Sequence, residues 1–352
     1  MKKLAAAVLV LVFGAGAGAF LLYSRMHAPF RGYSGPDQLV DVPPGEGTRA
    51  IGERLTAAGV VRDALTFRAA LKMSGNARRL KAGEYRFDRP MSMLEVIDKI
   101  ARGDVDLLSV TFPEGLTVAE MAAIFEARGF GPASTFISAA KDASAIQALD
   151  PSARDLEGYL FPDTYALPRQ APASRAVRAM IERFQQVLTP QVRAAAEARG
   201  LTVRQLVTLA SIVEKETARG DERPLVAAVY SNRLKVGMGL QSDPTVIYAL
   251  QLAGKYTGNL RRDDLHVDSP YNTYRYPGLP PGPIAAPGKA ALEAAANPAE
   301  VDYLYFVSRN DGSHEFARTL DEHNRNVQKY QVQYFRDLRA GKAGEAGRAG
   351  RQ

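Results

Sequence analysis

An uncharged run near the amino terminus constrains this chain most strongly. Lys2 and Lys3 precede twenty residues without a charge, from Leu4 to Tyr23, and about 20 helical residues span the hydrocarbon core of a bilayer. A signal peptide cut near residues 15–17 is the alternative, but the apolar run continues beyond that point. We therefore predict an uncleaved anchor over residues 1–25. The two lysines favour a cytoplasmic amino terminus, with the bulk of the chain across the membrane.

The positive charge of the chain lies at its two ends. The formal net charge is +7, but residues 1–31 hold four basic and no acidic residues, and residues 336–352 hold five basic and two acidic ones. The rest is formally neutral, whereas a nucleic-acid face needs a basic surplus on the folded surface. We therefore expect no nucleic-acid partner. The lack of cysteine excludes disulfides and thiolate sites, and the four histidines show no metal-ligand spacing, so no metal is expected.

A short repeat at an offset of 70 residues organises the region after the anchor. Ile51 and Leu55 in the first copy correspond to Met121 and Phe125 in the second, and each pair gives a helix one buried stripe. The alternating segment 81–87 indicates a strand. The sequence predicts an α+β chain made of a tether over 26–38, a small α+β module over 39–149, a second domain over 150–340 and a disordered tail over 341–352.

The second domain is expected to combine helices with long loops. Residues 174–187, 190–199 and a segment from Thr202 onward show helical patterns, and the stretch 240–298 is rich in loop residues. The apolar run Tyr303–Val307 predicts a buried strand. Residues 312–316 predict a turn into another strand, and residues 319–338 predict a closing helix.

Two glutamates near the end of one helix are the first chemical signal. Thr202 and Gln205 form a capping box at its start, and Glu214 and Glu216 follow its apolar stretch. Helical geometry puts both glutamates at the borders of the buried stripe. A carboxyl group half-buried beside apolar groups has a raised pKa, as a general acid working near neutral pH requires. Solvated glutamates are the common alternative, so this helix alone does not decide.

The loops that follow mix amides, a carboxylate and aromatic rings. The relevant segments are 238–248, 269–274 and 278–284. Sugar-binding clefts use this mixture because rings stack on pyranose faces, while amides bind hydroxyl and acetamido groups. Ordinary structural turns are the alternative for the same segments.

Several long motifs, in order, resemble the endolytic murein transglycosylase family, the YceG-like group. They are SIVEKET at 211–217, LQSDPTVIY at 240–248, YNTY at 271–274, GLPPGPI at 278–284 and YLYFV at 303–307. The resemblance implies a LysM-like first module and a lysozyme-like catalytic domain held at the cell inner membrane on its periplasmic side. It also implies peptidoglycan glycan strands as substrate, peptidoglycan synthases as partners and no cofactor.

That family is in turn similar to goose-type lysozymes, which have a catalytic Glu-Ser, a Gly-Leu-Met-Gln turn and an Ala-Tyr-Asn. Three elements of this chain look alike in the same order: Glu216-Thr217, Gly239-Leu240-Gln241 and Pro270-Tyr271-Asn272. The resemblance makes Glu216 the catalytic acid, with Glu214 as its rival. Together with the neighbouring motifs it predicts substrate contacts from Thr217, Gln241, Asp243, Tyr271, Asn272 and Tyr274, although a structural turn explains Asp243 equally well.

The implied mechanism needs one carboxyl group, whereas a glycosidase that uses water normally needs two. Protonated Glu216 would donate to the oxygen between MurNAc and GlcNAc. The resulting carboxylate would take the proton of the MurNAc C6 hydroxyl, leaving a 1,6-anhydro end on the nascent strand. Two alternatives stay open: a non-catalytic peptidoglycan-binding scaffold, and a muramidase of similar fold that hydrolyses with water.

Overall fold

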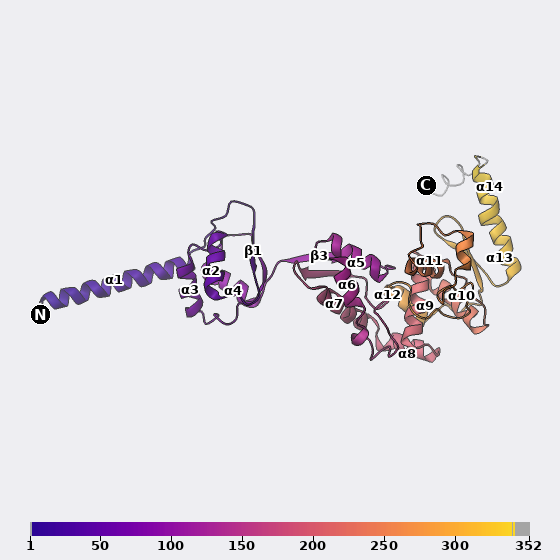
Figure 1. Ribbon diagram of the computed structural model, residues 1–352, viewed down its shortest axis with the longest axis horizontal. Coiled ribbons are helices and arrows are strands. Elements are labelled where there is room, and N and C mark those ends of the chain that lie inside the picture. Colours follow the sequence, from indigo (N-terminus) through magenta and orange to yellow (C-terminus); the bar gives the residue numbers. More distant parts are fainter. Residues whose placement is uncertain (1, 340, 342–352) are drawn as a thin grey trace. The chain divides into compact units, whose positions relative to one another are not determined.

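The computed structural model describes residues 2–339 and 341 of the chain (Figure 1). Contacts divide it into two compact units, Met1–Ser109 with Ala166–Ala171, and Val110–Tyr165 with Pro172–Gln352. The mixed α+β class is confirmed. The predicted domain boundaries at residues 38, 149 and 340 stay a prediction. The predicted tail, apart from residue 341, lies outside the described residues.

The first unit begins with the long apolar helix α1 (Lys2–His27). Over Leu9–His27 this helix is long and apolar enough to cross a membrane, judged by length and composition. Its last turn packs into the unit, where Met26 is buried in the core. Phe30 then exchanges two backbone hydrogen bonds with Met91, at 2.9 and 3.3 Å. The segment predicted as a tether is therefore packed against the unit in its first part.

Two strands and three helices complete the first unit. They are β1 (Gln38–Val42), α2 (Thr48–Ala57), α3 (Ala64–Met73), β2 (Gly83–Phe87) and α4 (Met93–Arg102). The strands are antiparallel with Val40 opposite Tyr85, and both side chains are buried. Helix α4 starts at a capping box between Ser92 and Glu95, which satisfies amide groups that the helix itself leaves free. The strand predicted over 81–87 is thus confirmed as β2.

The strand–helix–helix–strand order occurs twice. The second copy consists of β3 (Leu107–Thr111), α5 (Val118–Ala127), α6 (Ala133–Ala140) and β4 (Thr164–Pro168), and β3 pairs with β4. The predicted apolar pairs of the repeat, Ile51 with Leu55 and Met121 with Phe125, are all buried. The repeat at an offset of 70 residues is therefore a repeat of structure.

Helix α9 lies at the centre of the remaining part of the second unit (Figure 1). The helices of this part are α7 (Ala173–Val187), α8 (Pro190–Ala198), α9 (Val203–Glu216), α10 (Arg223–Lys235), α11 (Asp243–Leu252) and α12 (Lys289–Ala296). Helices α8, α10, α11 and α12 all contact α9. The expectation of loop across 240–298 was therefore incomplete. Pro244 permits α11 because the first turn of a helix needs no amide donor at that position.

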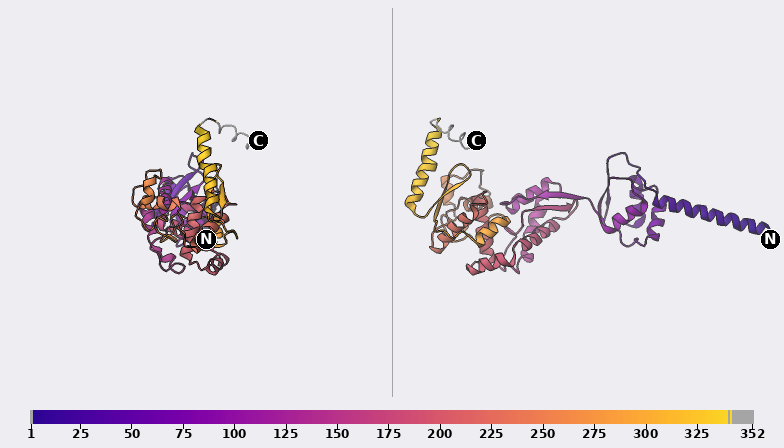
Figure 2. Two further views of the ribbon diagram at one scale, coloured as in Figure 1. Left: turned by 90° about the vertical axis from the view of Figure 1, so that its right-hand side faces the viewer. Right: turned by 180° about the vertical axis from the view of Figure 1, so that it is seen from behind.

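A small hairpin and one long helix close the chain (Figure 2). The strands β5 (Tyr305–Ser308) and β6 (His314–Ala317) are antiparallel. The helix consists of α13 (Leu320–Val327), a π-helical turn at Gln328–Gln333 and α14 (Tyr334–Arg339), so the closing helix is confirmed. The buried strand predicted from Tyr303 was wrong in detail. It starts at Tyr305 and is half-buried, because its sheet has two strands and cannot enclose both faces. Short 3₁₀ turns occur at Ala143–Ala145 and Arg262–His266.

Gly158 fixes the approach of two loops in the second unit. Its φ of +81° is in the left-handed region, and a Cβ there would lie 2.3 Å from Pro283 Cβ. Only glycine meets both conditions without displacing the 278–284 loop. The close contact therefore depends on this one residue.

Gly158→Ala is predicted to destabilise the second unit more than Gly200→Ala. Gly200 has a similar φ of +73° but nothing within 4 Å of its Cβ position, so it isolates the backbone strain. We expect about 1–2 kcal/mol for strain at either site and about 1–3 kcal/mol more at Gly158 for overpacking. Urea unfolding of both variants measures the difference, and equal losses would contradict the close packing.

Candidate active site

The carboxyl group of Glu216 sits at the end of the buried helix α9. The predicted capping box between Thr202 and Gln205 begins this helix, and residues 206–213 are all buried. Glu216 is its last residue and Thr217 its C-cap. Ending a buried helix here delivers the Glu216 side chain to a junction of α9, α10 and the start of α11.

Two hydroxyl groups donate to the same oxygen of Glu216. Tyr230 Oη on α10 and Ser242 Oγ, just before α11, each lie 2.5 Å from Glu216 Oε1. Within the described part of the chain, Oε2 receives no hydrogen bond. Burial raises the pKa of Glu216, opposed by the bonds from Ser242 and Tyr230, while the charge of Asp243 raises it further. One oxygen is therefore fixed and the other is left for a ligand.

The turn before α11 holds Ser242 in place. Gln241 has a φ of +51°, unusual for a residue with a side chain. The amides of Gln241 and Ser242 donate to the carbonyl and hydroxyl oxygens of Thr273, at 3.2 and 3.0 Å. A strained turn held by two hydrogen bonds is typical of a position that matters for function. The side chain of Gln241 itself is exposed.

The buried guanidinium group of Arg233 supports the same turn through a backbone carbonyl. Arg233 donates from Nη1 to the carbonyl of Leu240 and from Nε to that of Leu304, both at 2.7 Å. Its side chain also lies against the Tyr305 ring, 5.4 Å from the centroid. Burial lowers the pKa of Arg233. Arg233 thus ties the turn before Ser242 to the hairpin that begins with β5.

Asp243 and Tyr274 form a pair at the edge of the site. Tyr274 Oη donates to Asp243 Oδ1 over 2.6 Å, and Asp243 is the first residue of α11. Burial, followed by this bond, raises the pKa of the Tyr274 hydroxyl, and the charge of Glu216 adds to the increase. The structure therefore brings these two predicted residues into the electrostatic range of Glu216.

Tyr271 and Asn272 have other surroundings. Both hydrogens of the Asn272 amide are used inside its own loop, toward the carbonyls of Leu265 and Val267. Tyr271 packs edge-on against Tyr248, with ring centroids 4.9 Å apart. The substrate contacts predicted for these two residues stay a prediction. In the described residues, neither side chain contacts the Glu216 carboxyl group.

The rival carboxylate, Glu214, is occupied by protein partners. Arg223 Nη2 lies 2.9 Å from Glu214 Oε1, and the amide of Gly288, at the start of α12, donates to Oε2 over 3.0 Å. The side chain is only 6% exposed. Both oxygens of Glu214 therefore bind parts of the fold, in contrast to the single occupied oxygen of Glu216.

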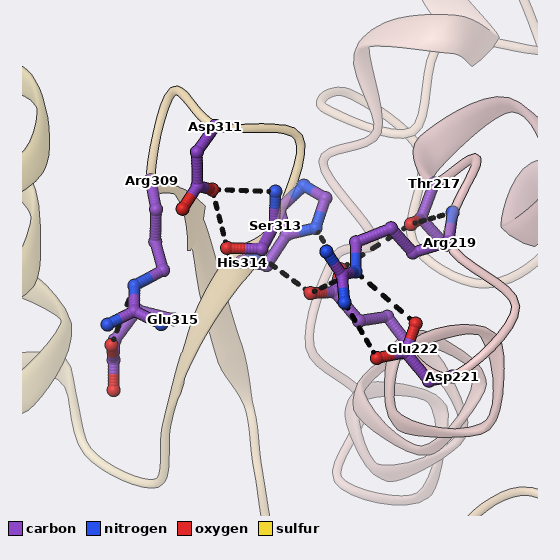
Figure 3. Close-up of polar contacts among 9 residues, drawn as sticks. All are labelled: Thr217, Arg219, Asp221, Glu222, Arg309, Asp311, Ser313, His314 and Glu315. Atoms are coloured by element: carbon purple, nitrogen blue, oxygen red, sulfur yellow. Dashed lines mark hydrogen bonds and ion pairs between the residues drawn. The ribbon is translucent and has the colours of Figure 1, made fainter. Parts of the chain in front are cut away.

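Thr217 contacts the carboxylate of Glu222, which joins the turn between α9 and α10 to His314 of the hairpin (Figure 3). Glu222 accepts the backbone amide of His314 at 3.0 Å, and its other oxygen lies 2.7 Å from His314 Nδ1. Thr217 Oγ1 is 3.5 Å from the same carboxylate. The hydroxyl of Thr217 therefore faces Glu222 in this structure, and the charge of His314 acts on Glu216 from this side.

The residues that sequence reasoning missed are those placed by tertiary structure. Tyr230 and Arg233 come from α10 and His314 from β6, and no spacing in the sequence connects them to Glu216. Ser242 lies inside the LQSDPTVIY motif, next to two residues that were singled out, so its hydroxyl was the one available signal. In the described ranges no group of three or more His, Asp or Glu side chains has the arrangement of a metal site.

The family model described as "YceG-like family" matches residues 40–329. The chain belongs to the YceG-like family.

Its curated relatives share a common name. It is 33% identical over 331 residues to "Endolytic murein transglycosylase" of Bacillus subtilis, covering 89% of this chain and 90% of the relative. It is 34% identical over 321 residues to the protein of that name from Streptococcus pneumoniae D39, covering 83% of this chain and 58% of the relative. A crystal structure of a yceG-like protein from Listeria monocytogenes is similar with a TM-score of 0.56 and 32% identity, covering 83% of this chain and 99% of that one.

The burial of Glu216 predicts a pH dependence of stability. Its pKa in the folded chain is raised above the ordinary value of 4.5, so the folded state holds this proton more tightly than the unfolded state. The resulting stability is fully present below pH 4.5 and is lost as pH rises through the folded pKa, with a slope of at most about 1.4 kcal/mol per pH unit. Glu216→Gln should flatten this fall in urea unfolding measured between pH 4.5 and 8.

Glu293→Gln serves as the control for that measurement. Glu293 is a half-exposed carboxylate on α12 in the same unit, paired with Lys289 at 3.6 Å. Its substitution reports the background effect of removing one carboxyl group. Identical slopes in the wild type and in both variants would contradict the assignment of Glu216 as the desolvated acid.

Proposed function

We propose that this chain is a membrane-anchored endolytic lytic transglycosylase that cleaves the MurNAc–GlcNAc bond of nascent peptidoglycan strands and leaves 1,6-anhydroMurNAc ends. Family membership and the shared name of the relatives support the murein transglycosylase class. The observation that carries the proposal is the Glu216 carboxyl group, with one oxygen held by two hydroxyls and the other free of protein partners in the described residues.

Glu216 is the general acid of the first step. Burial raises its pKa, which keeps the proton on the carboxyl group to higher pH than in an ordinary glutamate, and an acid catalyst needs this proton before bond cleavage. The proton passes from Oε2 to the glycosidic oxygen, and the bond between that oxygen and C1 of MurNAc breaks. The leaving GlcNAc gains the hydroxyl, and an oxocarbenium-like MurNAc remains beside the new carboxylate.

Glu216 then acts as the base. The carboxylate takes the proton of the MurNAc C6 hydroxyl while O6 forms a bond to C1, which gives the 1,6-anhydro ring and restores the protonated acid. Hydrogen bonds from Tyr230 and Ser242 stabilise the intervening carboxylate without any movement, since both donors already lie 2.5 Å from Oε1. The cycle consumes no water and needs no second carboxylate.

The surroundings of Asp243, the carboxylate next to Ser242, agree with a route that uses one acid. A retaining or inverting hydrolase needs a carboxylate free to attack C1 or to activate water. Asp243 instead accepts a hydrogen bond from Tyr274 at 2.6 Å. We assign Asp243, Tyr274 and Gln241 to the binding of the sugar next to the scissile bond. Thr217 is assigned to its contact with Glu222 at the end of α9, and Asn272 to the shape of its loop. A muramidase that uses water is the alternative and would leave reducing ends.

The remaining parts are assigned by the same proposal. Helix α1 is the membrane anchor, with a cytoplasmic amino terminus and the catalytic unit on the periplasmic side. The repeated strand–helix–helix–strand units form the LysM-like region, and the part around α9 is the lysozyme-like domain. Peptidoglycan synthases are the proposed partners, because a nascent strand is available for cutting where it is made.

Glu216→Gln is predicted to abolish anhydro-ended products from uncrosslinked glycan strands. Glutamine keeps the acceptor for Tyr230 and Ser242 but has no proton to donate, and loss of a general acid costs about 100-fold or more in rate. Mass spectrometry of the products of detergent-solubilised full-length protein is the measurement.

Glu214→Gln is the matched control for that assay. It changes a carboxylate two residues away that binds Arg223 and the amide of Gly288, so it should lower stability and still give anhydro ends. Anhydro ends lost with Glu214→Gln and retained with Glu216→Gln would transfer the role of acid to Glu214. Reducing ends from the wild type would make it a hydrolase, and no cleavage at all would favour the scaffold.

Tyr230→Phe is predicted to shift the pH profile of cleavage. The Tyr230 hydroxyl lowers the pKa of Glu216 against the larger effect of burial, so removing it raises that pKa. Because the acid must be protonated, the alkaline limb of kcat/KM should move to higher pH, while kcat falls because the carboxylate intermediate loses a donor. The edge-on contact of Tyr230 with Phe306 at 5.9 Å is retained by phenylalanine. A profile that stays in place or moves to lower pH would contradict the role of this hydroxyl.

A further inference from the structure

A cavity of about 550 Å³ lies in the second unit, and its lining includes neither Glu216 nor the two residues that donate to its carboxyl group. It is formed by the loop segments 152–159, 270–271 and 281–283 and by the Arg204 side chain of α9. The residues around it are Ser152, Arg154, Asp155, Glu157, Tyr159, Arg204, Pro270, Tyr271, Pro281, Gly282 and Pro283. The fold keeps the loops together, since Gly158 packs directly against Pro283.

The cavity combines apolar faces with fixed polar groups. The Tyr271 ring and three prolines supply flat apolar surface. Arg204 is held by Asp150 at 2.9 Å and by the carbonyl of Pro281 at 3.0 Å, so its position is set and its charge is compensated. Arg154 and Asp155 are exposed at the rim, one of each sign. Flat apolar surface beside hydrogen-bonding groups suits a sugar ring, which has apolar C–H faces and polar edges.

Glu157 keeps the interior of the cavity close to neutral. Its carboxyl group accepts the amide of Val118 at 3.1 Å and the hydroxyl of Tyr248 at 3.3 Å. Burial raises the pKa of Glu157 to about 8, the bond from Val118 opposes this, and the charges of Asp155 and Glu120 add to it. The group is therefore mostly protonated at neutral pH, and a neutral ligand meets no uncompensated charge from it.

One short loop connects this cavity to the Glu216 site. Tyr271 lines the cavity, and Thr273, two residues later, binds the amides of Gln241 and Ser242. Two residues of extended chain reach at most about 7 Å between their Cα atoms. Arg204 lines the cavity from the start of α9 and Glu216 ends the same helix, about 18 Å further along it, so a glycan polymer reaches both places only over several sugars.

We propose that this cavity is a saccharide subsite, which binds an N-acetylhexosamine unit of the glycan at a distance from the scissile bond. The proposal rests on the function proposed above and gives Tyr271 a role separate from that of Glu216. Tyr271 stacks on the bound sugar ring, and Arg154 binds its polar edge. The subsite holds the strand in register while Glu216 acts on a linkage several sugars away.

The first test measures binding without turnover. Full-length protein carrying Glu216→Gln is titrated calorimetrically with a peptide-free tetrasaccharide of alternating GlcNAc and MurNAc. Adding Tyr271→Ala or Arg154→Ala should raise the dissociation constant about 10-fold, which is the effect expected from the loss of one ring contact or one charged contact. Arg178→Ala is the control, because Arg178 is an exposed arginine that lines a different cavity of the same unit.

A filling variant separates binding from folding. A Cβ at residue 282 would meet only Tyr271 Oη at 3.5 Å and Arg204 Nη1 at 3.9 Å, which is ordinary contact. Gly282→Leu therefore fits the backbone and occupies the cavity, while Tyr271→Phe keeps the ring. We expect weak binding from Gly282→Leu at unchanged thermal stability and near-normal binding from Tyr271→Phe.

Kinetics of the active enzyme distinguish this proposal from the function on which it rests. With Glu216 intact, Tyr271→Ala, Arg154→Ala and Gly282→Leu should raise KM about 10-fold and leave kcat within twofold. Normal cleavage by all three variants overturns the subsite and leaves the transglycosylase in place. Loss of kcat with unchanged KM would assign Tyr271 to the reacting centre instead. Displacement of the tetrasaccharide by a free stem peptide would make this a peptide site, and absence of cleavage by the wild type overturns the proposed function itself.

Discussion

The candidate site depends on the cost of burying a carboxyl group at the end of a helix. A buried carboxylate without partners is unfavourable by several kcal/mol, so such a group is held neutral or receives strong donors. Both effects act on Glu216: burial and the charge of Asp243 favour its protonated form, while the hydrogen bonds from Tyr230 and Ser242 favour its ionised form. A group balanced in this way gives up and regains a proton without a large change in its surroundings, which the proposed mechanism requires at each turnover.

Two glutamates in one helical turn have opposite environments, and this contrast explains why only one is suited to acid catalysis. Arg223 and the amide of Gly288 compensate the charge of Glu214 and tie it to α10 and α12. Glu216 lies at the carboxyl end of α9, where the helix dipole opposes a negative charge and no cation lies within salt-bridge distance in the described residues. Glu214 thus contributes to the fold that positions Glu216.

Local signals in the sequence were enough for many of the elements, but not for α11 and α12 and not for the site around Glu216. The capping box at Thr202, the apolar stripe of α9 and the repeat with Ile51 and Met121 are properties of short segments, so they could be predicted. Tyr230 comes from another helix and shares no pattern with Glu216. Asn272 and Tyr271 were predicted to contact the substrate, yet the fold uses the Asn272 side chain inside its own loop and places Tyr271 in the lining of the cavity that also contains Glu157. Which of several polar residues faces a carboxyl group is decided by packing, which one sequence does not contain.

The loop 271–274 connects the cavity to the catalytic site in this fold. Its first residue lines the cavity, its third holds the turn that carries Ser242, and its fourth binds Asp243. Arg233 supports the same turn through the carbonyl of Leu240. The position of Ser242 beside Glu216 therefore rests on Thr273 and not on the side chain of Tyr271. Loosening the contact at Thr273 would remove a donor from Oε1, raise the pKa of Glu216 and destabilise its carboxylate form. Truncating the Tyr271 side chain leaves that contact in place, so the loop lets binding at the cavity and chemistry at Glu216 be changed separately.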